Sequence, residues 1–190
     1  MDLTTLTPTN LDDRVRVDAG VDLLGRRPPP PRMVLFSRGT ATLYAEGRPR
    51  RAEEPLLDHL VELAYLCQAV RSRHMALCFA GRGVTAVDEL VLHVATVRRP
   101  IGGGLRVEHR EHGMVLGDEG LVGWRPVRHI PVPGMIEALA RAAMRPPRRG
   151  RRAHHPALVA DVLSREGHRV IVTAPLARKV GGSDQVTVLP

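Results

Sequence analysis

The stretch MRPPRRGRRAHHP, residues 144–156, holds the densest group of side chains that could bind a ligand. Its arginines are Arg145, Arg148, Arg149, Arg151 and Arg152. No acidic residue lies between Glu137 and Asp161 to neutralise them. A guanidinium group binds phosphate or carboxylate oxygens through two parallel hydrogen bonds. The stretch therefore predicts contact with an anionic partner, either a nucleic acid or an acidic protein surface.

The same stretch also has the composition of a connecting loop. Its prolines and its glycine interrupt regular structure, and it contains no aromatic residue that could stack on an unpaired base. We interpret residues 145–155 as an arginine-rich loop that joins two helices and carries the strongest polyanion-facing surface of the chain. The acidic first 22 residues are an alternative partner for this loop, within one molecule or between copies in a homo-oligomer.

A second candidate site is the turn FAGRGVTAVDE, residues 79–89. If a strand ends here and a helix begins, Gly81 and Gly83 let the backbone approach a phosphate, and the free N–H groups of the helix bind it. Arg82 and Thr85 complete this phosphate-turn candidate. The spacing matches neither the P-loop nor the dinucleotide-binding pattern. The alternative is a purely structural turn in which Thr85 caps the helix.

The histidines of VEHREHG, residues 107–113, do not have the spacing of a metal site. On a strand, His109 and His112 point to opposite faces because their separation is odd. Neither zinc-protease pattern of paired histidines with a glutamate is present. We therefore interpret this segment as a solvated hairpin, and we predict no metal site and no cofactor.

No arrangement of residues identifies a catalytic nucleophile. The Gly-x-Ser-x-Gly pattern is absent. Cys67 and Cys78 both lie in apolar stretches, where a thiol is buried and unreactive. We predict that both cysteines are buried, reduced and dispensable for chemistry.

Composition places the chain among basic globular proteins. It has 190 residues, a net charge of +8 and a hydrophobic fraction of 43%, which is enough for one domain with a sizeable core. A basic surface attracts polyanions. No apolar run is long enough to cross a membrane, and the acidic start of the chain lacks the apolar region of a signal peptide. We expect no contact with a membrane, and a cytoplasmic location.

Hydrophobic spacing and turn residues predict a chain of alternating elements. The expected strands are 33–36, 41–47, 74–80, two or three within 105–127, 169–175 and 185–190, and the expected helices are 52–73, 81–99, 133–144 and 155–168. Alternation of strand and helix indicates an α/β fold. We therefore predict a single α/β domain, with a mixed, mostly parallel sheet, helices packed on it, and an N-terminal arm over residues 1–31.

The segment VDLLGRRPPPPRMVLF, residues 21–36, resembles the opening of an uncharacterised actinobacterial α/β family. In that family a short helix ends in Leu-Leu-Gly, and a proline-containing link leads to an apolar first strand. The order of elements is similar over residues 15–145, whereas the proline run and the arginine-rich segment depart from the family. The resemblance implies the fold and the type of host, and no activity.

These features lead to two hypotheses for function. In the first, a cytoplasmic, non-enzymatic binding or accessory protein contacts an anionic partner through its arginine-rich loop. In the second, a small-molecule phosphate-binding or hydrolytic enzyme is centred on the turn from Gly81 to Thr85. The two differ in whether Arg82 and the histidines converge on a pocket.

Overall fold

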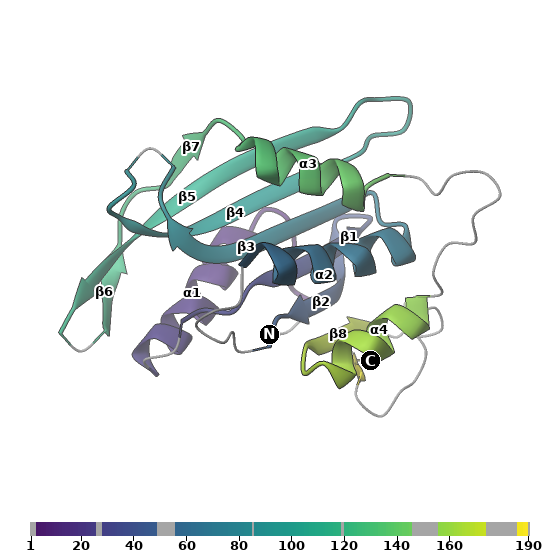
Figure 1. Cartoon of the computed structure of the whole chain (residues 1–190), viewed down its shortest axis with the longest axis horizontal. Helices are drawn as coiled ribbons and strands as arrows, with labels where there is room; N and C mark the ends of the chain where they lie inside the picture. Colours follow the sequence, from purple (N-terminus) through teal and green to yellow (C-terminus); the bar gives the residue numbers. More distant parts are fainter. Residues whose placement is uncertain are drawn as a thin grey trace.

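The computed structural model describes residues 3–25, 28–48, 56–84, 86–118, 120–145, 156–173 and 186–189 (Figure 1). Its helices are α1 (Leu11–Leu24), α2 (Leu56–Val70), α3 (Gly134–Ala143) and α4 (Pro156–Arg165). Its strands are β1 (Arg32–Ser37), β2 (Thr40–Glu46), β3 (His74–Arg82), β4 (Leu90–Arg98), β5 (Arg106–Gly117), β6 (Gly120–Trp124), β7 (Arg128–Ile130), β8 (Arg169–Thr173) and β9 (Val186–Leu189).

The strands form one sheet in the order β6-β5-β4-β3-β1-β2-β8-β9, with β7 also paired to β5. Every pairing between described strands is antiparallel except that of β8 with β9. The expectation of a mostly parallel sheet is therefore wrong. A parallel neighbour requires a crossover connection, usually a helix, whereas four of the eight pairings between described strands are hairpins.

The decisive difference lies at residues 81–99, which were expected to form a helix. The segment contains the second half of a hairpin, because β4 pairs with β3 over its whole length, from Leu90 opposite Arg82 to Arg98 opposite His74. Helices cover both faces of β4, so Val91, Leu92 and Val94 are all buried. A strand buried on both faces has a continuous apolar run, which periodicity alone does not separate from a buried helix.

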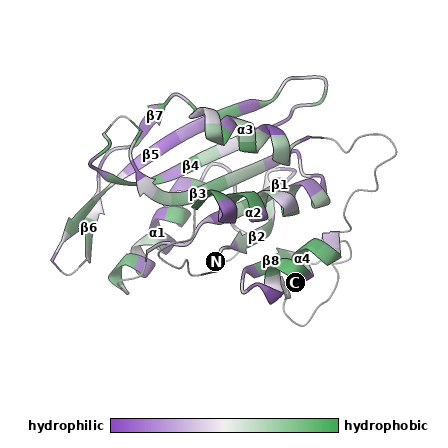
Figure 2. Ribbon diagram, in the orientation of Figure 1, coloured by the Kyte–Doolittle hydropathy of each residue, from purple (hydrophilic) through white to green (hydrophobic). Residues whose placement is uncertain are grey.

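The helices lie on both faces of the sheet (Figure 1). Helices α2, α3 and α4 cover one face and enclose the larger core, which includes Leu60, Leu63 and Leu77. Helix α1 covers part of the other face over a second core. In Figure 2, β3 is hydrophobic along most of its length, whereas the first half of β5 is hydrophilic.

The described part of the expected N-terminal arm belongs to the second core. Leu3, Leu6, Leu11 and Val15 are fully buried there. The amide of Ala41, in β2, donates to the carbonyl of Leu6 at 2.9 Å. Residues 3–24 thus act as a cover for the sheet.

Several local expectations are confirmed by the structure. The hairpin of β1 and β2, helix α2 and strand β3 lie where the sequence predicted them. Helix α4 ends before Gly167, which has a φ of +92°, the conformation that favours glycine after a helix. No helix in the described part of the chain has both the length and the apolar composition needed to span a membrane.

Candidate functional site

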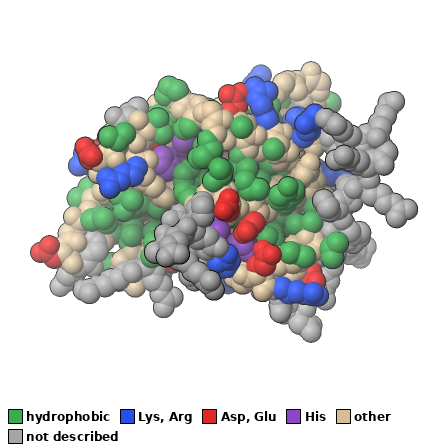
Figure 3. All heavy atoms as spheres, in the orientation of Figure 1, with side chains coloured by type: hydrophobic (Ala, Val, Ile, Leu, Met, Phe, Trp, Pro, Cys, Tyr) green, Lys and Arg blue, Asp and Glu red, His purple; other side chains and the backbone are tan. Residues whose placement is uncertain are grey.

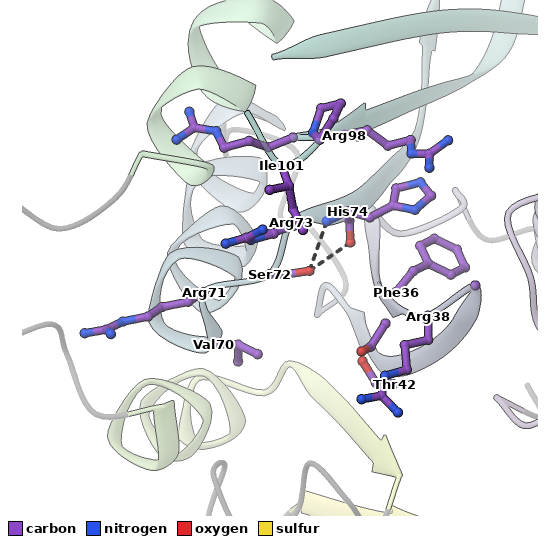
Figure 4. Close-up of a pocket in the computed structure, with 14 residues that line it drawn as sticks. Phe36, Arg38, Thr42, Val70, Arg71, Ser72, Arg73, His74, Arg98 and Ile101 are labelled. Atoms are coloured by element: carbon purple, nitrogen blue, oxygen red, sulfur yellow. Dashed lines mark hydrogen bonds between the residues drawn. The ribbon is translucent and has the colours of Figure 1, made fainter. Parts of the chain in front are cut away.

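A basic cleft lies where β1 ends, β3 begins and β4 ends, next to the C-terminal end of α2 (Figure 4). It has a volume of about 810 Å³ and continues into a second hollow of about 450 Å³. Residues 71–73 and 99–101 line both hollows. The two volumes therefore form one elongated feature, which we call the arginine cleft.

Six arginines line the arginine cleft. They are Arg38, Arg71, Arg73, Arg98 and Arg99 in the first hollow, with Arg145 joining in the second. Figure 4 shows that those in the first hollow come from three segments: the β1–β2 turn, the link from α2 to β3, and the end of β4. No aspartate or glutamate lines either hollow, and none of the six guanidinium groups forms an ion pair among the described residues. The described residues thus supply no salt bridge that neutralises their positive charge.

Two of these arginines occupy positions that favour glycine. Arg38 has a φ of +53° and precedes Gly39, with a φ of +85°, in the two-residue turn between β1 and β2. Such a turn needs positive φ at both central residues and is typically Asn-Gly or Gly-Gly. Arg38 therefore holds an unfavourable backbone conformation at the rim of the cleft.

Arg71 is in the same situation at the end of α2, with a φ of +58°. The amide of Arg71 donates to the carbonyl of Gln68 at 3.2 Å, and the amide of Ser72 donates to that of Cys67 at 3.3 Å. This is the Schellman pattern, in which the left-handed residue is usually glycine. In the described residues, Arg38 and Arg71 are the only non-glycine residues with positive φ, and both line the arginine cleft.

An aromatic pair borders the same cleft. The rings of Phe36 and His74 lie 4.9 Å apart between centroids and are tilted by 36°. The hydroxyl of Ser72 donates to the carbonyl of His74 at 2.9 Å and accepts from its amide at 3.3 Å, which holds the start of β3 in place. Burial and the charge of Arg98 lower the pKa of His74 below its usual value of 6.5, so the ring is neutral at pH 7.

Sequence reasoning missed this site because the cleft is assembled from distant segments. The register of β1, β3 and β4 places Phe36 and Arg98 on either side of His74, and no local pattern indicates that register. Among the arginines of the predicted loop, Arg145 lines the second hollow. The other four, Arg148, Arg149, Arg151 and Arg152, lie outside the described residues.

The predicted phosphate turn lies at the other end of the sheet. Gly81 and Arg82 end β3, Gly83 follows it, and Thr85 lies outside the described residues. The next element is strand β4, so the helix N-terminus on which the phosphate hypothesis depended does not exist. From His74 to Arg82 the strand extends about 26 Å at 3.3 Å per residue, so this turn and the arginine cleft are separate places.

The glycine at position 83 has a structural explanation. Its amide donates to the carbonyl of Glu89 at 3.0 Å, which closes the loop between β3 and β4. A Cβ at this position would lie 2.6 Å from the carbonyl oxygen of Ala86. Gly83 is thus required by a close approach within the loop.

Most of the segment 107–113 is buried, with Glu108 exposed. The segment does belong to a hairpin, but the interpretation that this hairpin is solvated is wrong. His109, Glu111 and His112 are each 2% exposed or less. Nε2 of His93 lies 2.9 Å from the carbonyl of Arg82, so this nitrogen donates, and Nδ1 of His93 accepts from Nε2 of His109 at 3.1 Å. Burial first, and the neighbouring His93 second, lower the pKa of His109 to about 4.

On the opposite face of β5, His112 forms part of the attachment of α1. Its Nε2 lies 3.1 Å from Oδ2 of Asp12, and Arg110 lies 3.2 Å from Oδ1 of the same carboxylate. The opposite orientation of His109 and His112 is thus confirmed. Asp22, at the other end of α1, pairs with the buried Arg32. Among the described residues, three aspartates of α1 pair with arginines within α1 or in the sheet: Asp12, Asp13 and Asp22.

Glu62, Glu166 and His168 could be considered as metal ligands, because one donor atom from each lies within 4.8 Å of the others. Figure 3 shows acidic side chains gathered over α2 and α4 on this face. However, Nδ1 of His168 accepts the amide proton of Arg48 at 3.2 Å, and Nε2 lies 2.8 Å from Oε2 of Glu62. The neutral ring therefore carries its proton on Nε2, where a metal would have to bind. The hydrogen bonds to Arg48 and Glu62 thus occupy both ring nitrogens of His168.

Both cysteines are free and buried, as predicted. Cys67 is 0% exposed and Cys78 is 1% exposed. Burial raises the pKa of each thiol to about 12. Since the thiolate is the reactive form, neither has the character of a nucleophile.

Comparisons with protein-family models, with curated proteins and with solved structures find no match to this chain. The similarity to an actinobacterial family remains a prediction.

Proposed function

We propose that this protein binds nucleic acid through the arginine cleft, as a binding or accessory protein. The observation that carries the proposal is a cleft lined by six arginines, without an acidic lining residue and without an ion pair for those arginines among the described residues. Guanidinium groups match the geometry of phosphate oxygens, and an elongated row of them suits a chain of phosphates.

The backbone conformations of Arg38 and Arg71 support this proposal. A left-handed conformation costs a non-glycine residue about 1–2 kcal/mol, and such outliers gather at functional sites. Both outliers here are arginines of one cleft. Glycine would be the more stable residue at both positions. The presence of arginine there indicates that its charge has a role.

The arginine-rich segment would extend the same surface. Arg145 is its first residue and already lines the second hollow. The segment leaves α3 at the arginine cleft, and its remaining arginines are expected to add phosphate contacts. Carboxylates of an acidic protein surface would bind the same groups, and the experiment below separates the two partners.

The test is the salt dependence of binding to a fluorescent nucleic acid. Each phosphate contact contributes about −0.7 to −0.9 to the slope of log K against log salt concentration. Replacing Arg71, Arg73 and Arg98 by Gln should weaken binding and flatten this slope by about two. A second variant with Arg148, Arg149, Arg151 and Arg152 changed to Ala measures the contribution of the loop.

The matched control replaces Arg14, Arg141 and Arg165 by Gln. These side chains are exposed on α1, α3 and α4, so the loss of net charge is the same and the cleft is intact. The control should keep the slope of the parent protein. Equal flattening in both triple variants, or preference for a polyglutamate competitor over nucleic acid, would refute a cleft that binds phosphates.

A further inference from the structure

We propose that the arginine cleft takes nucleic acid as an unpaired single strand, and that one base stacks on the ring of His74. This inference rests on the proposed function and specifies its ligand. Bases in a duplex face one another and are not available for stacking, whereas an unpaired base presents a face to an aromatic side chain. The structure places such a side chain among the arginines.

The first support is a cross-strand row on the face of the sheet that α1 partly covers. In the pairing of β1 with β3, the last registered pair is Leu35 opposite Met75, which makes Phe36 and His74 neighbours. His74 is directly opposite Arg98 on β4. The row therefore runs Phe36, His74, Arg98, and Figure 4 shows the His74 ring between the other two side chains.

The second support is the accessibility of this row. Phe36 is only 4% exposed, but His74 is partly exposed and Arg98 is exposed. Helix α1 packs on β4 and β6, where Gly20 lies close to Leu121. Among the described residues, the helix residues that line the cleft beside His74 are those at the end of α2. The ring of His74 thus has a buried aromatic neighbour on one side and, on the other, an exposed guanidinium that forms no ion pair within the described part of the chain.

The third support is a pair of like charges in the same row. Arg98 is directly opposite Arg106 on β5, and both are exposed. Like charges directly opposite on neighbouring strands are destabilising. Glu108 lies two pairs further along, opposite Thr96, and forms no ion pair with either arginine among the described residues. A bound phosphate between the two guanidinium groups would relieve this repulsion.

These contacts divide the recognition of a single strand between two kinds of group. The arginines bind the phosphates, and the neutral ring of His74, supported by Phe36, binds a base through its face. Arg98 can lie over the exposed side of that base, because a guanidinium stacks on aromatic rings. Stacking depends on the face of the base and not on its edge, so little sequence preference is expected.

The experiment compares three fluorescent probes: a short thymidylate oligonucleotide, an abasic oligonucleotide with the same number of phosphates, and a duplex of the same length. The parent protein should bind the thymidylate strand at least about fivefold more tightly than the abasic strand, which is the lower end of the stacking contribution of one base. His74→Ala should remove this difference. It should weaken binding of the abasic strand far less than binding of the thymidylate strand, and the slope of the salt dependence, which the arginines determine, should be retained.

Further variants separate stacking from structural damage. His74→Phe keeps a ring without a titratable group and should retain the preference for thymidylate. His129→Ala, at an exposed position on β7, is the control for loss of a histidine and should change nothing. Thermal unfolding checks that each variant is folded.

The inference on stacking and the proposed function fail in different ways. Equal affinity for the thymidylate and abasic strands, or tighter binding of the duplex, would overturn stacking and leave phosphate binding in place. Loss of the preference in both His74→Phe and His74→Ala would also overturn it. Binding of none of the three probes would overturn the proposed function and this inference with it.

Discussion

At the scale of single residues, Arg71 offers a test of whether the cleft was selected for binding at the cost of stability. Its φ of +58° lies in a region that glycine enters without strain. We expect Arg71→Gly to increase the free energy of unfolding by about 1 kcal/mol and to weaken binding of nucleic acid. Chemical denaturation and a binding titration on the same preparation measure both effects.

Arg73→Gly is the matched control for that experiment. It lines the same cleft but its φ is not positive, so glycine brings no relief of strain. The substitution should weaken binding and leave the protein equally stable or less stable. A destabilised Arg71→Gly variant, or one with unchanged binding, would contradict the proposal that Arg71 favours binding at the cost of stability.

His109 carries a prediction on pH dependence. Its pKa in the folded protein, about 4, lies below the value of 6.5 in the unfolded chain, so the unfolded chain takes up the proton first as the pH falls. The stability that depends on neutral His109 is therefore present above pH 6.5 and is lost between pH 6.5 and 4. Over this pH range the free energy of unfolding should fall by about 3 kcal/mol.

NMR titration of the histidine ring protons measures this directly. The ring of His109 should remain neutral down to about pH 4, and the denaturation midpoint of the protein should fall over the same range. A His109 ring that titrates near pH 6.5 would show that the contact with His93 is not formed as described.

At the scale of the elements, helix α1 is fastened to the sheet by Asp12. Arg110 and His112 both contact its carboxylate, and both side chains are largely buried. Burial alone would raise the pKa of Asp12, but the hydrogen bond with His112 and the charges of Arg110, His112 and Arg16 lower it overall. The pair of contacts thus favours the ionised carboxylate.

Removing that carboxylate should leave two buried cationic or polar groups without a partner. We expect Asp12→Ala to lower the free energy of unfolding by about 1–3 kcal/mol. The neighbouring Asp13 is 73% exposed and pairs with Arg16 on the same helix, so Asp13→Ala should change stability by less than about 0.5 kcal/mol. Equal effects of the two substitutions in urea denaturation would contradict the anchoring role of Asp12.

The elements also show how far sequence patterns reach. The β1–β2 hairpin, α2, β3, α3 and α4 follow from turn residues, prolines and apolar spacing that act locally. Strand β4 was predicted to be helical because its apolar residues are buried from both sides. Its valines favour a strand, and this preference was the better guide.

At the scale of the whole molecule, the candidate site depends on contacts that no local pattern describes. The sequence predicted that arginines would bind an anion, and it identified Arg145 and the loop that follows. It did not predict that Arg38, Arg71 and Arg98 would line one cleft, because they come from segments that only the antiparallel sheet brings together. Because β4 was predicted to be a helix, the sequence also predicted a phosphate-binding turn at the end of β3, far from the arginine cleft.

The measurement that tests the central claim most directly is a map of the bound nucleic acid on the protein. Amide ¹H–¹⁵N spectra of the parent protein, titrated with the thymidylate oligonucleotide, report each backbone position. The proposed site predicts that the largest shifts occur at residues 38–42, 70–74 and 98–103, which border the arginine cleft. Shifts concentrated at residues 81–90, at the opposite end of β3, or the absence of any shift would contradict it.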